Sequence, residues 1–270
     1  MQNTFVPALA GGHMTKTEDE PDRDRVGAAQ TVFEIIEQVR AEASPTLSDI
    51  AREVPYAKST VFRHLQTLES LGLVVERANG YQLGLRFLQL SQRACRSHPG
   101  YELAREKVAE IATETGERAQ YIVEEHGEAV YLCRAVGARG VRTDPGIGSR
   151  IPLHSTAAGK AILAAMTAEQ AAAILAEQPL AARTDATITD ERRLFDALER
   201  GRERGYSLNR EENVSGLNAV GVPVVVDDTV VGALSVSGPS HRLAGDRLTG
   251  ELPDYLLGAA NELQLNVAYA

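Results

Sequence analysis

The chain has 270 residues, 43% of them hydrophobic and 24% charged, which is the composition of a globular protein and favours two domains. The formal net charge of −9 taken alone argues against a nucleic-acid-binding protein. However, residues 22–97 carry ten basic and nine acidic side chains, whereas residues 98–270 carry 17 and 25. The acidity therefore lies outside the N-terminal part, which can still bind phosphates through locally placed positive charges.

Neither a membrane span nor a secretory signal is expected. No apolar run is long enough to cross a bilayer, and no basic segment precedes a long apolar block at the start. These features predict a soluble, cytoplasmic protein. Cys95 and Cys133 belong to no CxxC motif, so buried free thiols are favoured over a disulfide or a metal site.

The first segments of the chain differ sharply in pattern. Residues 1–21 are polar and are expected to be a disordered tail, and residues 1–13 resemble a cloning remnant because Gly11-Gly12-His13 precedes a second methionine. A helix is then predicted over residues 27–41, where Val32, Ile35, Ile36 and Val39 form an apolar stripe.

Residues 46–73 indicate two helices joined by a tight turn. Leu47, Ile50 and Val54 recur at helical spacing, and Pro55 ends the first helix because proline has no N–H to donate. The second helix starts near residue 57 and ends at Gly72, which fits the C′ position. Its apolar face holds Val61, Leu65 and Leu68, whereas its polar face holds Ser59, Thr60, Arg63, His64 and Thr67. Such a helix–turn–helix can place its second helix in the major groove of double-stranded DNA.

A β-hairpin is predicted directly after these helices. Asn79-Gly80 is a strong signal for a two-residue turn, and apolar residues flank it on both sides. The first domain, residues 22–84, is therefore predicted to be a winged helix–turn–helix. Arg63 is expected to read a base or a phosphate, and the N-terminal residues of its helix to hold phosphate. The candidate DNA-contacting residues are Lys58, Ser59, Thr60, Arg63, His64, Arg77 and Tyr81.

Two of these assignments have a plainer alternative. The polar face of the second helix can be only a solvated surface, but the tight turn before it and the hairpin after it disfavour that interpretation. Tyr81 can equally be a packing residue of the wing.

A helical segment, residues 85–97, ends at His98-Pro99-Gly100 and is predicted to link two domains over residues 85–100. The second domain, residues 101–270, mixes helices and strands. Helices are predicted over residues 101–115, 156–165, 167–177, 190–204 and 248–267, and strands over residues 119–125, 129–136, 151–154, 206–209, 219–226 and 230–237. The expected fold is α+β, with one central antiparallel sheet and helices on its faces.

The chain resembles the isocitrate lyase regulator (IclR) family of transcriptional regulators. The resemblance rests on LSDIAREVPYAKSTVFRHLQTLESLGLV in the first domain and on IPLHSTAAGKAILA, GYSLNREENVSGLNAVGVPV and GALSVSGPSHRL in the second. It implies a winged helix–turn–helix, a linker helix and a GAF-like effector-binding domain. It also implies a homodimer, or a dimer of dimers, that binds a partly palindromic operator and responds to a small organic acid.

The resemblance further implies where the acid binds. Ala157 and Ala158 would lie on one wall of the site, and Asn209, Ala219, Ser235 and Ser237 on the other. Hydroxyl groups and the N–H groups at a helix N-terminus can hold a carboxylate without a formal counter-charge. Many relatives carry Asp at the position of Asn209 and Cys at that of Ala219. The two serines alternate with Val236, so they share one face of a strand, which is either this wall or a solvated surface.

Other chemistries find less support. His154-Ser155 suggests a hydrolase, but there is no GxSxG elbow. The AAGK sequence at residues 157–160 lacks the Ser or Thr of a phosphate-binding loop, and His126 has no second histidine at ligand spacing. No catalytic residue, metal or cofactor is therefore expected. The alternative to a DNA-binding regulator is a metabolite-binding protein or small-molecule enzyme whose helix–turn–helix is not used on DNA.

Overall fold

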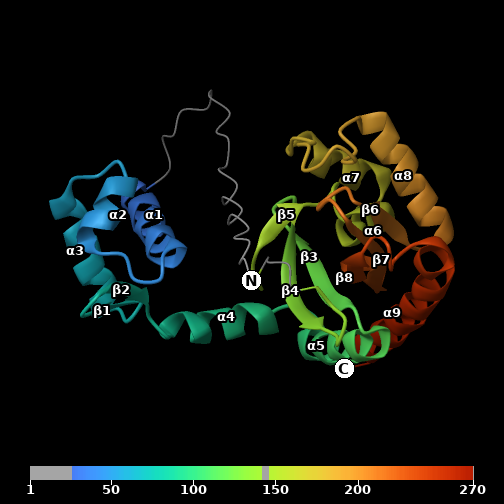
Figure 1. Cartoon of the computed structure of the whole chain (residues 1–270), viewed down its shortest axis with the longest axis horizontal. Helices are drawn as coiled ribbons and strands as arrows, with labels where there is room; N and C mark the ends of the chain where they lie inside the picture. The colour runs from blue at the N-terminus through green and yellow to red at the C-terminus, as the bar shows by residue number, and fades with distance from the viewer. Residues whose placement is uncertain (1–25, 142–145, 270) are drawn as a thin grey trace, which may run out of the picture. The chain divides into compact units, whose positions relative to one another are not determined.

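The computed structural model describes residues 26–141 and 146–269 (Figure 1), so the expectations for the tail at residues 1–21, including the remnant at 1–13, lie outside the described residues. The chain separates into two compact units between Leu90 and Ser91, inside helix α4 (Arg86–Arg96). This boundary falls within the segment expected to be the linker. In the described part of the chain, no helix is long and apolar enough to cross a membrane.

In the described part of the first unit, a compact group is formed by the helices α1 (Gly27–Ala41), α2 (Leu47–Glu53) and α3 (Lys58–Ser70). Their predicted apolar stripes meet in one core, which contains Ile35, Ile36, Val39, Ile50, Val54, Val61, Leu65 and Leu68. A capping box starts α2, because the Thr46 hydroxyl accepts from the Asp49 N–H and the Asp49 carboxylate accepts from the Thr46 N–H. The helix–turn–helix is thus confirmed at the level of its packing.

Gly72 ends α3 as predicted. Its φ is +69°, and the Leu73 N–H donates to the Leu68 carbonyl oxygen at 2.9 Å while the Gly72 N–H donates to that of Glu69 at 2.8 Å. These two bonds form a Schellman motif, which needs a residue that tolerates a left-handed backbone at this position.

The wing consists of the antiparallel strands β1 (Val74–Arg77) and β2 (Gly80–Leu83). Because Arg77 pairs with Gly80, the turn is made by residues 78–79, and the predicted turn at residues 79–80 is wrong by one position. Gly80 has a φ of +136°, and a Cβ on it would lie 2.6 Å from the Pro45 carbonyl oxygen. The glycine therefore serves where the wing packs against the loop between α1 and α2.

The second unit is built on a six-stranded antiparallel sheet. In chain order the strands are β3 (Arg118–Glu125), β4 (Glu128–Val136), β5 (Arg150–Pro152), β6 (Ser207–Arg210), β7 (Leu217–Val226) and β8 (Thr229–Pro239). Their spatial order is β5-β4-β3-β8-β7-β6. Two hairpins turn at residues 126–127 and 227–228, between predicted strands, and all four residues have positive φ, as type I′ turns require.

Helices cover both faces of this sheet (Figure 1). On one face pack α5 (Tyr101–Thr115) and α9 (Leu252–Ala268), and their core includes Val108, Ile111, Leu234, Val236 and Leu256. On the other face lie α6 (Ala157–Ala165), α7 (Ala168–Ala176) and α8 (Glu191–Arg204), with a separate core around Ile122, Tyr131, Ile162, Leu163 and Leu194. The predicted α+β class, with a winged helix–turn–helix and a domain built on a central antiparallel sheet, is confirmed.

The predicted C-terminal helix divides into two parts. Residues Arg247–Glu251 form a π-helical turn, η1, and the regular helix α9 begins only at Leu252. Pro253 lies in the first turn of α9, where its missing N–H costs no hydrogen bond.

Both cysteines are free, as predicted. Cys133 is buried, and burial raises the pKa of its thiol to about 12. Cys95 is only half-buried, so the prediction of a fully buried thiol is wrong for this residue.

Candidate functional site

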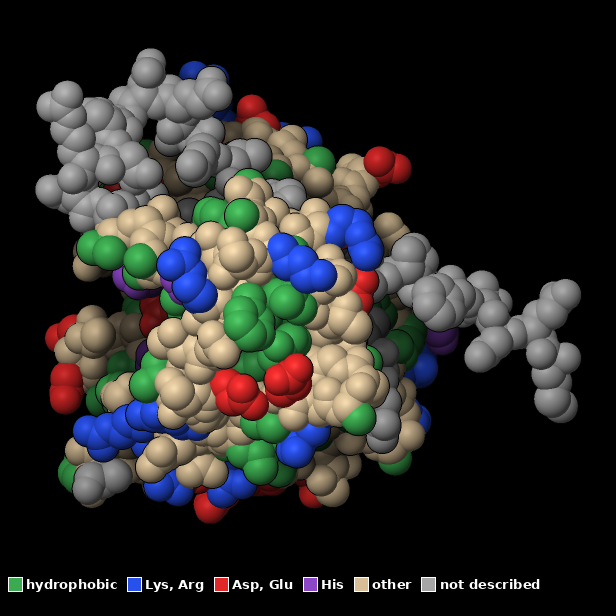
Figure 2. All heavy atoms as spheres, turned by 90° about the vertical axis from the view of Figure 1, so that its left-hand side faces the viewer, with side chains coloured by type: hydrophobic (Ala, Val, Ile, Leu, Met, Phe, Trp, Pro, Cys, Tyr) green, Lys and Arg blue, Asp and Glu red, His purple; other side chains and the backbone are tan. Residues whose placement is uncertain are grey.

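The polar face of α3 is turned to solvent. Val61, Leu65 and Leu68 are at most 1% exposed, so they anchor the helix on the core. Ser59 and Arg63 are exposed on the opposite side, and Thr60 and His64 are half-exposed. This side of the unit carries several Lys and Arg side chains on a largely uncharged surface (Figure 2). A helix held in this way presents a row of donors that fits the edge of a DNA duplex.

The remaining candidates at the DNA face differ in their surroundings. The Lys58 ammonium donates to the Ser48 hydroxyl at 2.7 Å, so the lysine joins the first turns of α2 and α3. Arg77 is exposed at the end of the wing strand β1. Tyr81 is only 5% exposed and packs in the core of this unit. The structure therefore supports the alternative role of Tyr81 in packing, and its assignment as a DNA-contacting residue is withdrawn.

Two exposed residues of α3 were not among the predicted DNA-contacting residues. Phe62 is 40% exposed, and Gln66 is exposed one turn after it. Together with Ser59 and Arg63 they form an i, i+3, i+4, i+7 row, which is one face of a helix. This spacing is visible in the sequence.

The first wall of the predicted effector site is the N-terminus of α6. Thr156 caps this helix, since its hydroxyl accepts from the Gly159 N–H at 3.0 Å. Ala157 and Ala158 are each 1% exposed, and their N–H groups have no hydrogen-bond acceptor within residues 26–141 and 146–269. Two buried donors at the positive end of a helix favour an anionic or strongly polar acceptor.

Gly221 brings this helix end against the sheet. A Cβ on Gly221 would lie 2.5 Å from the Ala157 carbonyl oxygen and 2.6 Å from the Ala158 nitrogen, so no larger residue fits there. Gly221 also pairs with Ser235 across β7 and β8. The close approach therefore places the N-terminus of α6 beside Ser235, which is itself 2% exposed.

The other predicted residues share one row across the sheet. Asn209 pairs with Ala219, and Ala219 pairs with Ser237, on the adjacent strands β6, β7 and β8. Because paired residues of antiparallel strands point to the same face, the three side chains lie on the face that α6 covers. Asn209 and Ala219 are buried, and Ser237 is half-buried. The structure thus brings all six predicted residues onto one face of the sheet or onto the helix end above it.

Asn209 has a structural task at this site. Its side-chain amide nitrogen donates to the Ser155 carbonyl oxygen at 2.6 Å, and its side-chain oxygen accepts from the Glu212 N–H at 2.9 Å. These two hydrogen bonds hold the turn before α6 against β6, and the contact of Asn209 with a ligand stays a prediction. An aspartate could keep the second bond but has no N–H for the first.

A buried ion pair supports the same helix. The Lys160 ammonium lies 2.6 and 2.5 Å from the two carboxylate oxygens of Glu212, and the side chains are 4% and 9% exposed. Desolvation lowers the pKa of Lys160, and the neighbouring Glu212 opposes that shift. Lys160 thus binds Glu212, and its ammonium group does not take the position of a phosphate-binding lysine.

Two more polar residues of β3 join the predicted set. Gln120 pairs with Ser235 and donates from its side-chain nitrogen to the Ser235 and Ser237 hydroxyls at 3.2 and 3.3 Å. Arg118 pairs with Ser237 and donates from Nε to the Gln120 side-chain oxygen at 3.0 Å. The sequence predicted a strand over residues 119–125, but nothing in it indicated which face of that strand would meet the serines.

The residues that suggested other chemistries have structural partners. The His154 Nε2 lies 3.2 Å from the Ala181 carbonyl oxygen. The Ser155 hydroxyl donates to the Pro152 carbonyl oxygen at 3.3 Å. Burial lowers the pKa of His154. His126 occupies a hairpin turn with a φ of 55°. Within the part of the chain that the structure describes, no three His, Cys, Asp or Glu side chains are grouped to hold a metal.

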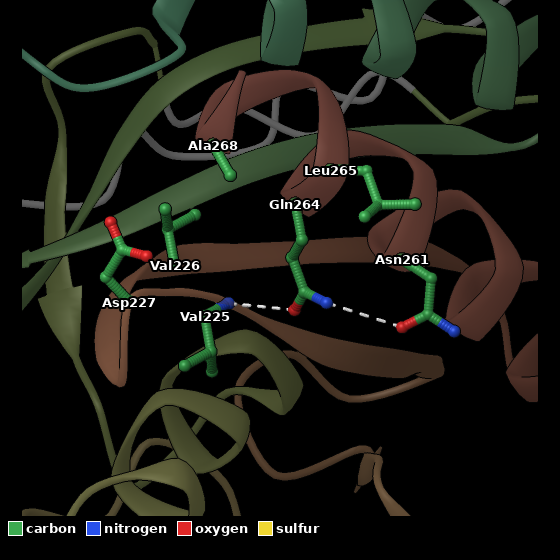
Figure 3. A pocket seen from close by; sticks show the side chains of 7 residues that line it. All are labelled: Val225, Val226, Asp227, Asn261, Gln264, Leu265 and Ala268. Atoms are coloured by element: carbon green, nitrogen blue, oxygen red, sulfur yellow. Dashed lines mark hydrogen bonds between the residues drawn. The ribbon is translucent and has the colours of Figure 1, made fainter. Parts of the chain in front are cut away.

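A hollow of about 340 Å³ lies elsewhere, where the end of β7 meets α9 (Figure 3). The Gln264 amide in it is already used, because its oxygen accepts from the Val225 N–H and its nitrogen donates to Asn261. The hollow is lined by Val225, Val226, Asp227, Asn261, Gln264, Leu265 and Ala268. It belongs to the side of the sheet that α9 covers, opposite the face described above.

Comparisons with known proteins agree with this architecture. Residues 28–78 match the model of the IclR helix-turn-helix domain, and residues 92–265 match that of the bacterial transcriptional regulator IclR C-terminal domain. The probable HTH-type transcriptional regulator ArcR of Halobacterium salinarum is 30% identical over 251 residues, which are 91% of this chain and 95% of that protein.

Solved structures give the same result. The crystal structure of the Thermotoga maritima IclR has a TM-score of 0.78 at 27% identity and covers 90% of this chain and 99% of its own. The inducer-binding domain of an Acinetobacter PobR double mutant, in complex with 3-hydroxybenzoic acid, has a TM-score of 0.55 at 26% identity and covers 60% and 96%. With its helix–turn–helix and its C-terminal effector-binding domain, the chain belongs to the IclR family of transcriptional regulators.

Proposed function

We propose that the protein binds a partly palindromic operator as a homodimer, and that a small organic acid in the C-terminal site changes this binding. The single observation that carries the DNA part is the geometry of α3. Val61, Leu65 and Leu68 are buried in the core, whereas the face with Ser59, Arg63 and Gln66 is exposed. In this proposal α3 enters the major groove, and Arg77 of the wing contacts the backbone or the minor groove.

The DNA part is tested by a binding titration with the DNA upstream of the protein's own gene. Arg63→Ala removes a side chain that can bond two acceptors of one guanine, an interaction worth about 1–3 kcal/mol, so the specific Kd should rise about 5- to 150-fold. Arg40→Ala is the matched control, because Arg40 is exposed on α1 and pairs with Glu37. Equal affinity of the two variants would contradict the assignment of α3 as the recognition helix.

The effector part follows from the donors on the covered face of the sheet. The hydroxyls of Ser235 and Ser237 and the N–H groups of Ala157 and Ala158 are suited to a carboxylate. The PobR complex with 3-hydroxybenzoic acid shows a related domain holding such an acid. In a thermal-shift screen of small acids, a ligand that binds the folded state should raise the melting temperature. If the Ser235→Ala, Ser237→Ala double variant keeps the full shift of the best acid, the site lies elsewhere.

The dimer follows from exposed apolar side chains of the first unit and from the symmetry of operators. Phe33 on α1 and Leu85, Leu88 and Leu90 at or near the start of α4 are 50–80% exposed. Self-association through α4 would cover the three leucines, and a two-fold dimer matches a palindromic site. Sedimentation of the wild type at micromolar concentration should give at least twice the chain mass, and a purely monomeric species would contradict the dimer.

The same proposal assigns the protein to the cytoplasm, where its DNA lies, and treats it as a regulator and not an enzyme. The support is that the matched relatives are transcriptional regulators. The division into a DNA-binding domain at residues 22–84, a linker at 85–100 and an effector domain at 101–270 is part of the proposal. Turnover of any acid that binds would contradict it.

A further inference from the structure

A strap of residues 178–189 connects α7 to α8 and contains no helix or strand. One side of the strap is bonded to the chain just before α6, because the His154 Nε2 lies 3.2 Å from the Ala181 carbonyl oxygen. His154 is 2% exposed and comes two residues before Thr156, which caps α6. The strap is therefore fixed beside the first wall of the proposed effector site.

The other side of the strap is bonded to the turn that follows β6. The Thr184 hydroxyl donates to the Glu211 carbonyl oxygen at 2.7 Å. The Thr187 hydroxyl donates to the Glu212 carbonyl oxygen at 2.6 Å. This turn starts two residues after Asn209, which belongs to the second wall of the site. The strap thus extends from one wall of the site to the other.

The backbone of Arg183 is held between these two attachments. Its N–H donates to the Thr187 hydroxyl oxygen at 3.0 Å, and the Thr184 N–H donates to the same oxygen at 2.9 Å. The Arg183 side chain, by contrast, is exposed, and its guanidinium makes no hydrogen bond or ion pair with any residue of 26–141 or 146–269. The strap therefore holds the backbone of an arginine whose charged end is still available.

The charge of Arg183 acts on the face of the sheet that α6 covers. Burial lowers the pKa of His154, and the positive charge of Arg183 adds to this shift. Burial raises the pKa of Tyr131, and the charge of Arg183 is among those that oppose the rise. Tyr131 packs in the same core as Ala158 of α6. The guanidinium is thus close enough to influence two side chains that border the first wall.

The other ionisable groups at this wall supply no counter-charge to Arg183. Lys160 and Glu212 form a buried ion pair with each other. His154 is neutral near pH 7, because its pKa is lowered from 6.5. The positive end of the α6 dipole adds to the charge of the arginine rather than offsetting it. An anionic ligand suits this surrounding better than an uncharged ligand of the same shape.

We propose that Arg183 binds the carboxylate of the effector, so that the strap selects acids over uncharged molecules of the same shape and is held on the site by the bound acid. The proposal rests on the effector site of the proposed function and adds the residue that recognises the charge. The planar guanidinium can bond both oxygens of one carboxylate, which an ammonium group cannot.

The test measures Kd by calorimetry on the full chain with matched probes. The acids are 3-hydroxybenzoate, benzoate, pyruvate and succinate, and each is compared with its uncharged amide. In the wild type, the acid that binds most tightly should be preferred to its amide. Arg183→Gln should lower this preference about fivefold or more by raising the Kd of the acid, with the Kd of the amide unchanged. Arg183→Lys keeps the charge but not the fork, and it should retain part of the preference.

Arg192→Gln is the matched control, because Arg192 is exposed on α8, outside the strap, and it should keep the wild-type preference. Hydrogen exchange gives a second readout. The bound acid should slow exchange of the strap amides in the wild type and in Arg192→Gln, and much less in Arg183→Gln. The urea midpoint without ligand should be the same in all three proteins, since the Arg183 side chain makes no bond that the fold needs.

Two outcomes separate the inference from the proposed function. If an acid binds and Arg183→Gln keeps the wild-type preference, or if the bound acid leaves the exchange of the strap unchanged, the role of Arg183 is refuted while the effector site stands. If none of the four acids binds the wild type, the role of Arg183 and the effector part of the proposed function are both refuted.

Discussion

The buried pair of Lys160 and Glu212 predicts a specific pattern of stability changes. The pair joins α6 to the segment that follows β6, with both side chains at most 9% exposed. Glu212 is fixed further by its backbone, because its N–H donates to Asn209 and its carbonyl oxygen accepts from the Thr187 hydroxyl at 2.6 Å. Removing one charge therefore leaves the other buried in a region that cannot easily rearrange.

The magnitude follows from this burial. Breaking a buried ion pair by removing one partner costs about 3–5 kcal/mol, whereas replacing both partners by uncharged residues of similar volume is often nearly neutral. We expect Lys160→Met and Glu212→Gln each to cost about 3–5 kcal/mol, and the double variant to cost much less than their sum. At a denaturant dependence of about 2–3 kcal/mol per molar urea, each single variant should lower the unfolding midpoint by about 1–2.5 M.

The assay is urea unfolding of the four proteins, combined with hydrogen exchange of α6 and β7 peptides by mass spectrometry. Hydrogen exchange shows which unit loses stability. Amides of the second unit should exchange faster in the single variants, whereas those of the helix–turn–helix should exchange at the wild-type rate. If the single variants cost less than about 1 kcal/mol, or if their effects simply add, then the pair is not desolvated as the structure indicates.

Two further predictions concern the same region. Gly221→Ala should destabilise the protein by about 1–3 kcal/mol or more in chemical unfolding, because the added Cβ would meet the backbone at Ala157. Gly258→Ala is its control, since no atom lies within 4 Å of a Cβ at this exposed helical position, and it should stabilise by up to about 1 kcal/mol. Equal effects would contradict the close approach of α6. Burial lowers the pKa of His154, so the unfolded chain binds a proton at this side chain more readily than the folded chain does. The stability that neutral His154 contributes should therefore be present above its ordinary pKa of 6.5. It should be lost as the pH falls through the lowered pKa of the folded state. The difference in melting temperature between pH 7.5 and pH 5.5 should therefore shrink in His154→Gln, and an unchanged difference would refute this assignment.

Several features of the fold could be predicted because they depend on neighbours in the chain. Apolar spacing placed α3 and its buried residues, and Gly72 marked the end of that helix. The turns at residues 126–127 and 227–228 lie between the strands predicted over residues 119–125 and 129–136 and over residues 219–226 and 230–237. The wing turn was predicted one residue too late. A glycine is needed at position 80 because the backbone there lies against the Pro45 carbonyl group, 35 positions away, and not because residue 80 is part of the turn.

The sequence by itself determined the helix–turn–helix, the strands and the family, since repeating apolar patterns and contiguous motifs carry them. Only the tertiary structure decided which side chains share the face beneath α6. It placed Arg118 and Gln120 beside Ser235 and Ser237, more than a hundred positions away, and it turned Asn209 to the backbone of Ser155. The physical reason is that strand register is set by the pairing of distant segments, so the composition of a sheet face is not encoded in any single stretch of chain.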